Sequence, residues 1–134
     1  MTLVVDASVA AQWVLPEAQS ARAKALLLTG EPIIAPDLVY AEIGNAIWKR
    51  AVRGELPLAA AAEALATATA LFTSLVPMAV LAARAVELAI KMKHPIYDCF
   101  YVALADRERA PLITTDKRLL ALGKLVKGVE FRQL

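Results

Sequence analysis

LITTDKRL, residues 112–119, is a short apolar segment that ends in two threonines and an acid, Asp116. LVVDASVA, residues 3–10, has the same form, with three apolar residues directly before Asp6. Each segment is typical of a buried strand that passes at once into a helix. If the two strands are parallel, both carboxylates lie at one edge of a sheet, outside the carboxyl ends of the strands, where open α/β sheets bind their ligands.

Strand-like and helix-like segments alternate along the rest of the chain. Strands are predicted at 2–5, 32–36, 74–77, 112–114 and 129–131, and helices at 8–14, 17–28, 37–53, 58–72, 79–92, 98–108 and 117–122. This alternation predicts an α/β fold with a mostly parallel central sheet flanked by helices. No linker, repeat or low-complexity segment interrupts it, so residues 1–134 are predicted to form a single domain.

Composition excludes several classes of protein. The net charge is only +2, so bulk charge does not indicate a nucleic-acid partner, and the one cysteine, Cys99, excludes an intrachain disulfide and favours a reducing, cytoplasmic location. The uncharged stretch 64–83 is rich in Ala and Thr and contains Pro77, so we expect no membrane span. The hydrophobic fraction of 59% exceeds the usual ~45–50% and favours a homodimer or another bound partner.

Two further acids lie in the middle of the chain. Asp98 precedes an apolar segment that is predicted to be a helix, and Glu42 lies inside the predicted helix 37–53, with Asn45, the only asparagine, three residues later. Asp6, Asp98 and Asp116 each have the alternative of a helix N-cap. Glu42 has no capping role, and its alternative is a solvated edge or a local pair with Lys49.

Four carboxylates in one crevice require either protons or a cation. Two unit charges about 5 Å apart repel by roughly 3 kcal/mol at an effective dielectric constant near 20. Oxygen ligands without a set of His and Cys side chains select Mg²⁺ or Mn²⁺ rather than zinc. A carboxylate-held Mg²⁺ suits phosphate chemistry, because it activates water and neutralises the charge that develops on phosphate oxygens.

These segments, in this order, resemble those of PIN-domain ribonucleases, in particular the small VapC-type toxins of toxin–antitoxin pairs. The quoted matches are VVDASV, LVYAEIGNAIWK, YDCFYVALA and LITTDKRL, and together they cover nearly the whole chain. Each motif is weak alone, but four in order at family-like spacing are specific. The departures are Cys99 and Phe100, at positions where small or varied residues are usual.

The resemblance implies a role for each acid. Asp6 and Asp98 would bind Mg²⁺ or Mn²⁺ directly, while Glu42 and Asp116 would complete the catalytic cluster and position the attacking water. Three polar side chains would support the acids by hydrogen bonds: Ser8, Asn45 and Thr114. The implied reaction is endoribonuclease hydrolysis of RNA without a covalent intermediate, and the implied partners are a cognate antitoxin and a second protomer.

Other classes of protein also carry acids at strand ends. A phosphoaspartate receiver needs paired acids after its first strand, and a haloacid-dehalogenase-type phosphatase needs a second aspartate where this chain has Ser8. A PIN-like RNA-binding or scaffold module without turnover stays open, as does a free-standing PIN nuclease without an antitoxin.

Candidate contacts outside the acids are basic and aromatic. The basic groups that could bind RNA phosphates are Lys49, Arg50 and Arg53; Lys91 and Lys93 beside His94; and Lys117 with Arg118. Their alternative is a solvated helix face. The apolar anchors considered for an antitoxin are Val9, Trp13, Val14, Tyr40 and Trp48, with a buried core position as the alternative for the aromatic ones.

Overall fold

Five short strands form one parallel sheet in the computed structural model, which describes all of residues 1–134. The spatial order is β3-β2-β1-β4-β5, so β1 lies at the centre. The strands are β1 (Leu3–Val5), β2 (Ile33–Pro36), β3 (Ser74–Val76), β4 (Leu112–Thr114) and β5 (Phe131–Gln133). The predicted α/β class with a parallel sheet is confirmed.

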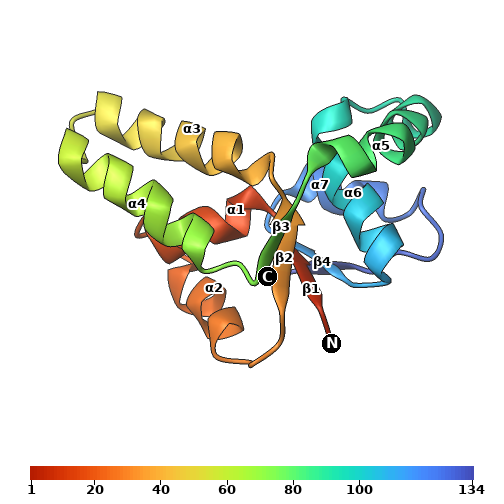
Figure 1. Cartoon of the computed structure of the whole chain (residues 1–134), viewed down its shortest axis with the longest axis horizontal. Coiled ribbons are helices and arrows are strands. Elements are labelled where there is room, and N and C mark those ends of the chain that lie inside the picture. The colour runs from red at the N-terminus through yellow and green to blue at the C-terminus, as the bar shows by residue number, and fades with distance from the viewer.

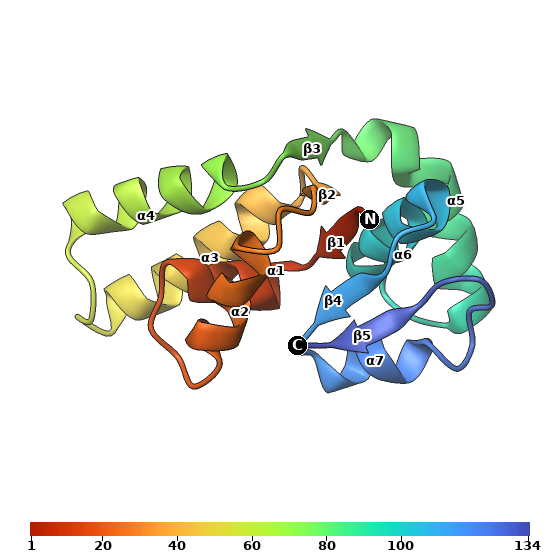
Figure 2. The same ribbon diagram turned by 90° about the horizontal axis from the view of Figure 1, so that it is seen from below.

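Helices cover both faces of this sheet. Figure 1 shows α1 to α4 on one side of the strands and α5 to α7 on the other. In Figure 2, α3 and α4 form a hairpin that projects away from the sheet as an arm. The helices are α1 (Ala7–Ala10), the 3-10 helix η1 (Ala11–Trp13), α2 (Ser20–Leu27), α3 (Val39–Val52), α4 (Leu58–Ala70), α5 (Met78–Met92), α6 (Ile96–Glu108) and α7 (Lys117–Leu122).

Several predicted boundaries were wrong. The predicted helix 8–14 is a single α-turn followed by η1, and the predicted helix 17–28 begins only at Ser20. The last strand lies two residues later than predicted, because Phe131 pairs with Leu112 of β4. Helix α6 begins at Ile96, directly after Pro95, whose fixed φ suits the start of a helix.

The uncharged stretch 64–83 divides as expected into the end of α4, strand β3 and the start of α5. No helix in the chain is both long and apolar enough to cross a bilayer.

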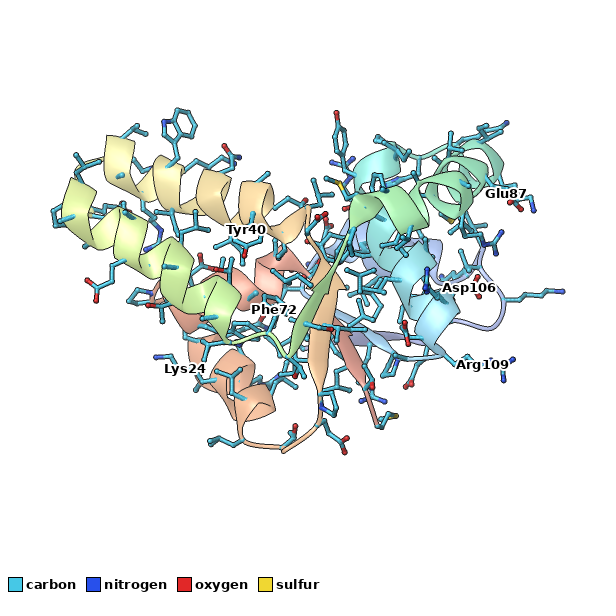
Figure 3. The ribbon with its side chains drawn as sticks, viewed as in Figure 1. Lys24, Tyr40, Phe72, Glu87, Asp106 and Arg109 are labelled. Atoms are coloured by element: carbon cyan, nitrogen blue, oxygen red, sulfur yellow. The ribbon has the colours of Figure 1, made fainter.

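The core fixes the helices that carry the acids. On the face of α3 that packs against the core, Val39, Ile43 and Ile47 are buried, and Ala46 is partly buried. Trp13 is also core: its indole Nε1 donates to the Ala23 carbonyl at 2.9 Å, and its ring centroid lies 5.1 Å from that of Phe72, which Figure 3 shows beyond the end of α4. These contacts hold α1, η1 and α3 against the same side of the sheet.

Candidate active site

Three acid-bearing segments begin at the carboxyl edge of the sheet. Strands β1 and β4 are parallel neighbours, with Val5 opposite Ile113, so the residues that follow them lie side by side. Helix α3 follows β2, and α6 packs against β1, β2 and β4. The fold therefore brings segments from the two ends and the middle of the chain to one place.

Asp6 is buried, and hydroxyl groups from two strand ends donate to its carboxylate. Ser8 Oγ donates to Oδ1 at 2.6 Å, and Thr114 Oγ1 donates to Oδ2 at 2.5 Å. The backbone N–H of Val9 also donates to Oδ1, at 3.3 Å, so Asp6 is the N-cap of α1 as well. The capping and site interpretations of Asp6 are thus compatible, because each carboxylate oxygen has more than one lone pair.

Glu42 faces the same edge from α3, and its partner is a residue that the sequence did not identify. The buried Tyr101 hydroxyl donates to Glu42 Oε1 at 2.6 Å. No ion pair joins Glu42 to Lys49, which contradicts the local-pair alternative. A signal was available, because Tyr101 lies three residues after Asp98 and so on the same face of a helix.

Asp98 does not cap a helix. Because α6 begins at Ile96, Asp98 lies in its first turn, where a carboxylate is stabilised by the helix dipole. Its Oδ2 lies 2.7 Å from Nε2 of the mostly buried His94, four residues earlier. The sequence analysis did not pair His94 with Asp98, and their spacing of four residues was the missed signal.

Asp116 lies at the rim of the site. It caps α7, with Oδ1 accepting from the Arg118 backbone N–H at 2.8 Å, while its own N–H donates to Thr114 Oγ1 at 2.9 Å. The capping interpretation therefore holds for Asp116 too. Thr114 links Asp116 to the buried Asp6, so the two strand ends belong to one hydrogen-bonded unit.

Burial and mutual repulsion raise the affinity of the acids for protons. Desolvation raises the pKa of Asp6 to about 6, against the hydrogen bonds from Ser8, Thr114 and Val9, and the charge of Asp98 adds to the rise. Desolvation likewise raises the pKa of Glu42 to about 7, with further contributions from the charges of Asp6 and Asp98. Asp6, Glu42 and Asp98 therefore share one electrostatic environment, whereas Asp116 contributes to neither shift.

The cluster has no basic counterpart except His94. No Lys or Arg side chain forms an ion pair with any of the four acids. An oxygen-only donor set without a compensating positive charge fits a hard divalent cation. The side chains as they stand do not converge into a ready-made cage, because no three of them are grouped closely enough to hold an ion. Water molecules would then complete the coordination of a bound ion, as Mg²⁺ usually requires.

A groove of about 630 Å³ borders the cluster. One wall is α3, the other is α1 with the segment after η1, and Tyr97 and Thr115 lie at the end nearest the sheet. The α3 wall carries Glu42, Asn45, Lys49 and Arg53 at spacings of three, four and four residues, which place all four on one helical face. Asn45 is exposed in this groove and makes no hydrogen bond to the acids, so the hydrogen bond predicted for it stays a prediction.

The chain belongs to the PIN domain family, whose pattern matches residues 3–125. A relative from Pyrobaculum aerophilum, described as ribonuclease VapC3, is 33% identical over 121 residues, which are 89% of this chain and 92% of the relative. A crystal structure of a protein from the same organism is 27% identical, with a TM-score of 0.72 over 98% of this chain and 92% of the other.

A crystal structure from Mycobacterium tuberculosis has the same fold at greater distance. It is described as VapBC-5, a member of the VapBC family of toxin–antitoxin systems. It shares 20% identity with this chain and has a TM-score of 0.58 over 99% of this chain and 98% of the other. The resemblance seen in the four acid-bearing motifs is thus confirmed at the level of the family and the fold.

Proposed function

We propose that the protein is a metal-dependent endoribonuclease that hydrolyses RNA phosphodiester bonds, and that it is the toxin of a toxin–antitoxin pair. The observation that carries this proposal is the cluster of Asp6, Glu42 and Asp98, which lacks a Lys or Arg partner and lies beside a groove with basic side chains on α3. The relative described as ribonuclease VapC3 supports the choice of RNA as substrate. An RNA substrate also agrees with the expected cytoplasmic location.

In this proposal Asp6 and Asp98 hold Mg²⁺ or Mn²⁺, and Glu42 and Asp116 complete the catalytic set. The cation supplies Lewis acidity and charge neutralisation when it is bound. Ser8 and Thr114 fix the orientation of the Asp6 carboxylate, and the Tyr101 hydroxyl fixes that of Glu42. Glu42, with its pKa near neutrality, is suited to accept a proton from the attacking water.

The test is cleavage of total RNA by purified protein freed of any co-purifying partner, with and without Mg²⁺, followed by sequencing of the new RNA ends. We expect discrete cuts with Mg²⁺ and none after chelation. Asp98→Asn should abolish them and weaken Mg²⁺ binding by the folded protein. Asp116→Asn should retain more metal affinity than Asp98→Asn, since its carboxylate lies at the rim. Full activity of Asp98→Asn would exclude the proposed site.

An antitoxin would silence the site by neutralising the cluster. An Arg side chain suits this role, because its planar fork binds carboxylates in a bidentate manner and competes with the cation. The apolar anchor set needs correction: Val9 and Trp13 are buried in the core, whereas Tyr40 and Trp48 of α3 are exposed. Figure 3 shows Tyr40 on the side of α3 that faces α4.

The partner is tested by co-expression with the small open reading frame next to the gene. We expect a complex in which RNA cleavage is inhibited, and a homodimer of the toxin by size measurement. Trp48→Ala should weaken the complex, whereas cleavage by the free protein should be unchanged. If the protein is monomeric and no adjacent gene product binds it, a free-standing PIN nuclease replaces the toxin interpretation.

A further inference from the structure

The basic residues on α3 differ in whether they are free to bind a ligand. Arg50 is engaged: it donates to the Pro16 carbonyl and to Glu17 Oε1, both at 3.1 Å, and lies 3.6 Å from Glu55. Lys49 and Arg53 are exposed in the groove and have no ion pair or side-chain hydrogen bond. Two positive charges in the groove are therefore available for phosphates.

The spacing of Lys49 and Arg53 from Glu42 separates negative from positive charge along the groove. Lys49 and Arg53 follow Glu42 by seven and eleven residues, which is about 10 Å and about 16 Å along the helix axis at 1.5 Å per residue. Negative charge thus lies at the sheet end and positive charge along the arm. A nucleic-acid strand that places one phosphate beside the acids would reach Lys49 and Arg53 with the phosphates that follow.

One aromatic side chain in this groove is unexplained by packing. Tyr97 lines the sheet end of the groove, its side chain is 63% exposed, and its hydroxyl has no hydrogen-bond partner. It precedes Asp98 in the first turn of α6, so its backbone is fixed by the same helix start. Leu38 and Ala41 of α3 also line this groove and offer apolar contact near the acids.

We propose that Tyr97 determines base preference, by stacking against the nucleobase next to the scissile phosphate while Lys49 and Arg53 bind phosphates farther along the strand. The proposal rests on the ribonuclease function and adds a specificity residue to it. An exposed ring can stack on any base, but stacking strength differs between bases, so the contact gives a modest base preference. Loss of one such contact weakens binding by roughly tenfold or more. RNA is favoured over a protein ligand for this ring because the free charged side chains farther along the same groove, Lys49 and Arg53, are cationic.

The binding test uses single-stranded 12-nucleotide RNAs with 2-aminopurine at each position in turn, titrated with protein in EDTA so that no cleavage occurs. We expect fluorescence quenching at one position with the wild type and with Tyr97→Phe. Tyr97→Ala should lose the quenching and bind roughly tenfold more weakly, with an unchanged salt dependence. Lys49→Ala is the matched control: it should keep the quenching and reduce the slope of log affinity against log salt by about 0.7.

Cleavage-end sequencing gives the second readout. Tyr97→Ala should flatten the base preference at one position beside the cut, while Lys49→Ala should lower all cuts alike. RNA binding by Tyr97→Ala within twofold of the wild type, or an equal loss in Tyr97→Phe, would overturn the stacking role and leave the ribonuclease function intact. If Tyr97→Ala instead loses only antitoxin binding, the ring belongs to that interface and the proposal is wrong. A wild type that neither binds nor cuts RNA would contradict the function itself.

Discussion

At the scale of single residues, the hydroxyl groups of Ser8 and Thr114 act both as donors and as acceptors around Asp6. The N–H groups of Thr115 and Asp116 donate to Ser8 Oγ and Thr114 Oγ1. Each hydroxyl in turn donates to the Asp6 carboxylate, which can only accept when it is ionised. This arrangement favours the ionised form of Asp6 in a buried position that otherwise disfavours charge.

Replacing Thr114 by Val should raise the pKa of Asp6 above about 6, because one of the hydrogen bonds that lowers it is lost. Divalent-metal affinity should then require a higher pH, as a metal ligand must be deprotonated. We also expect a loss of ~1–3 kcal/mol in the free energy of unfolding. Calorimetric Mg²⁺ titrations between pH 5.5 and 8.5 measure the shift. Thr115→Val is the control, since the Thr115 hydroxyl makes no hydrogen bond, and equal effects of the two variants would contradict the ordered network.

Tyr101→Phe should raise the pKa of Glu42 above about 7, because the Tyr101 hydroxyl donates to the carboxylate and favours its charged form. The pH–rate profile of RNA cleavage should move to higher pH, with activity reduced at pH 7 and partly recovered at pH 8.5. Tyr97→Phe removes a hydroxyl without a partner and should leave the pH midpoint in place. An unshifted profile for Tyr101→Phe would show that Glu42 does not limit the reaction.

The sequence predicted the acids more readily than their partners. Asp6 and Asp116 were predicted because each follows an apolar strand, and Ser8 and Thr114 because the family resemblance implies a role for them. Tyr101 and His94 were missed because their neighbours in the sequence do not distinguish them from ordinary helix or loop residues. Their roles depend on where α6 begins and on its placement against α3, which only the tertiary packing determines.

At the scale of elements, α3 carries within one turn a paired charge, Arg50, and a charge that we propose binds RNA, Arg53. Arg50→Ala should lower stability by ~1 kcal/mol and the melting temperature by about 4 °C, since partly exposed ion pairs contribute little individually. Arg53→Ala should leave the melting temperature within about 1 °C and weaken RNA binding in a salt-dependent manner. Thermal unfolding and RNA titrations of both variants check this division, and the reverse pattern would refute it.

Element types were more predictable than their ends or their spatial order. The predicted segments include every strand and nearly every helix, but the predicted helix 8–14 is divided into α1 and η1. Trp13, the last residue of η1, donates a hydrogen bond to Ala23, a tertiary contact that local pattern does not show. The order β3-β2-β1-β4-β5 could not be read from local pattern, because it depends on the direction of each crossover between strands. The N-terminal strand lies centrally for that reason.

At the scale of the whole molecule, stability should depend on pH in the direction opposite to that of a protein with paired acids. The pKa of Asp6 is raised from 3.8 to about 6 and that of Glu42 from 4.5 to about 7, so the folded state holds protons that the unfolded state has released. Stability of the metal-free protein should therefore fall as the pH rises from about 4 to about 7. The Asp6 shift alone corresponds to at most about 3 kcal/mol.

Mg²⁺ should reverse this loss. We expect a melting temperature in EDTA that is lower at pH 7.5 than at pH 5.5, and an increase with Mg²⁺ that is larger at pH 7.5, because the cation binds the ionised carboxylates of the folded state. Asp98→Asn should reduce both effects, since it removes a charge that raises the other two pKa values. Scanning calorimetry at the two pH values is the measurement, and a metal-free protein that gains stability toward pH 7.5 would refute the assignment.

The pairing of β1 with β4 has a consequence for biosynthesis. Asp6 and the neighbour that completes its surroundings, Thr114, are 108 residues apart along the chain. A nascent chain therefore cannot assemble the proposed catalytic cluster before Thr114 has been synthesised and β4 has paired with β1. Under the proposed function, the nuclease would be inert while the residues between these two positions are being made.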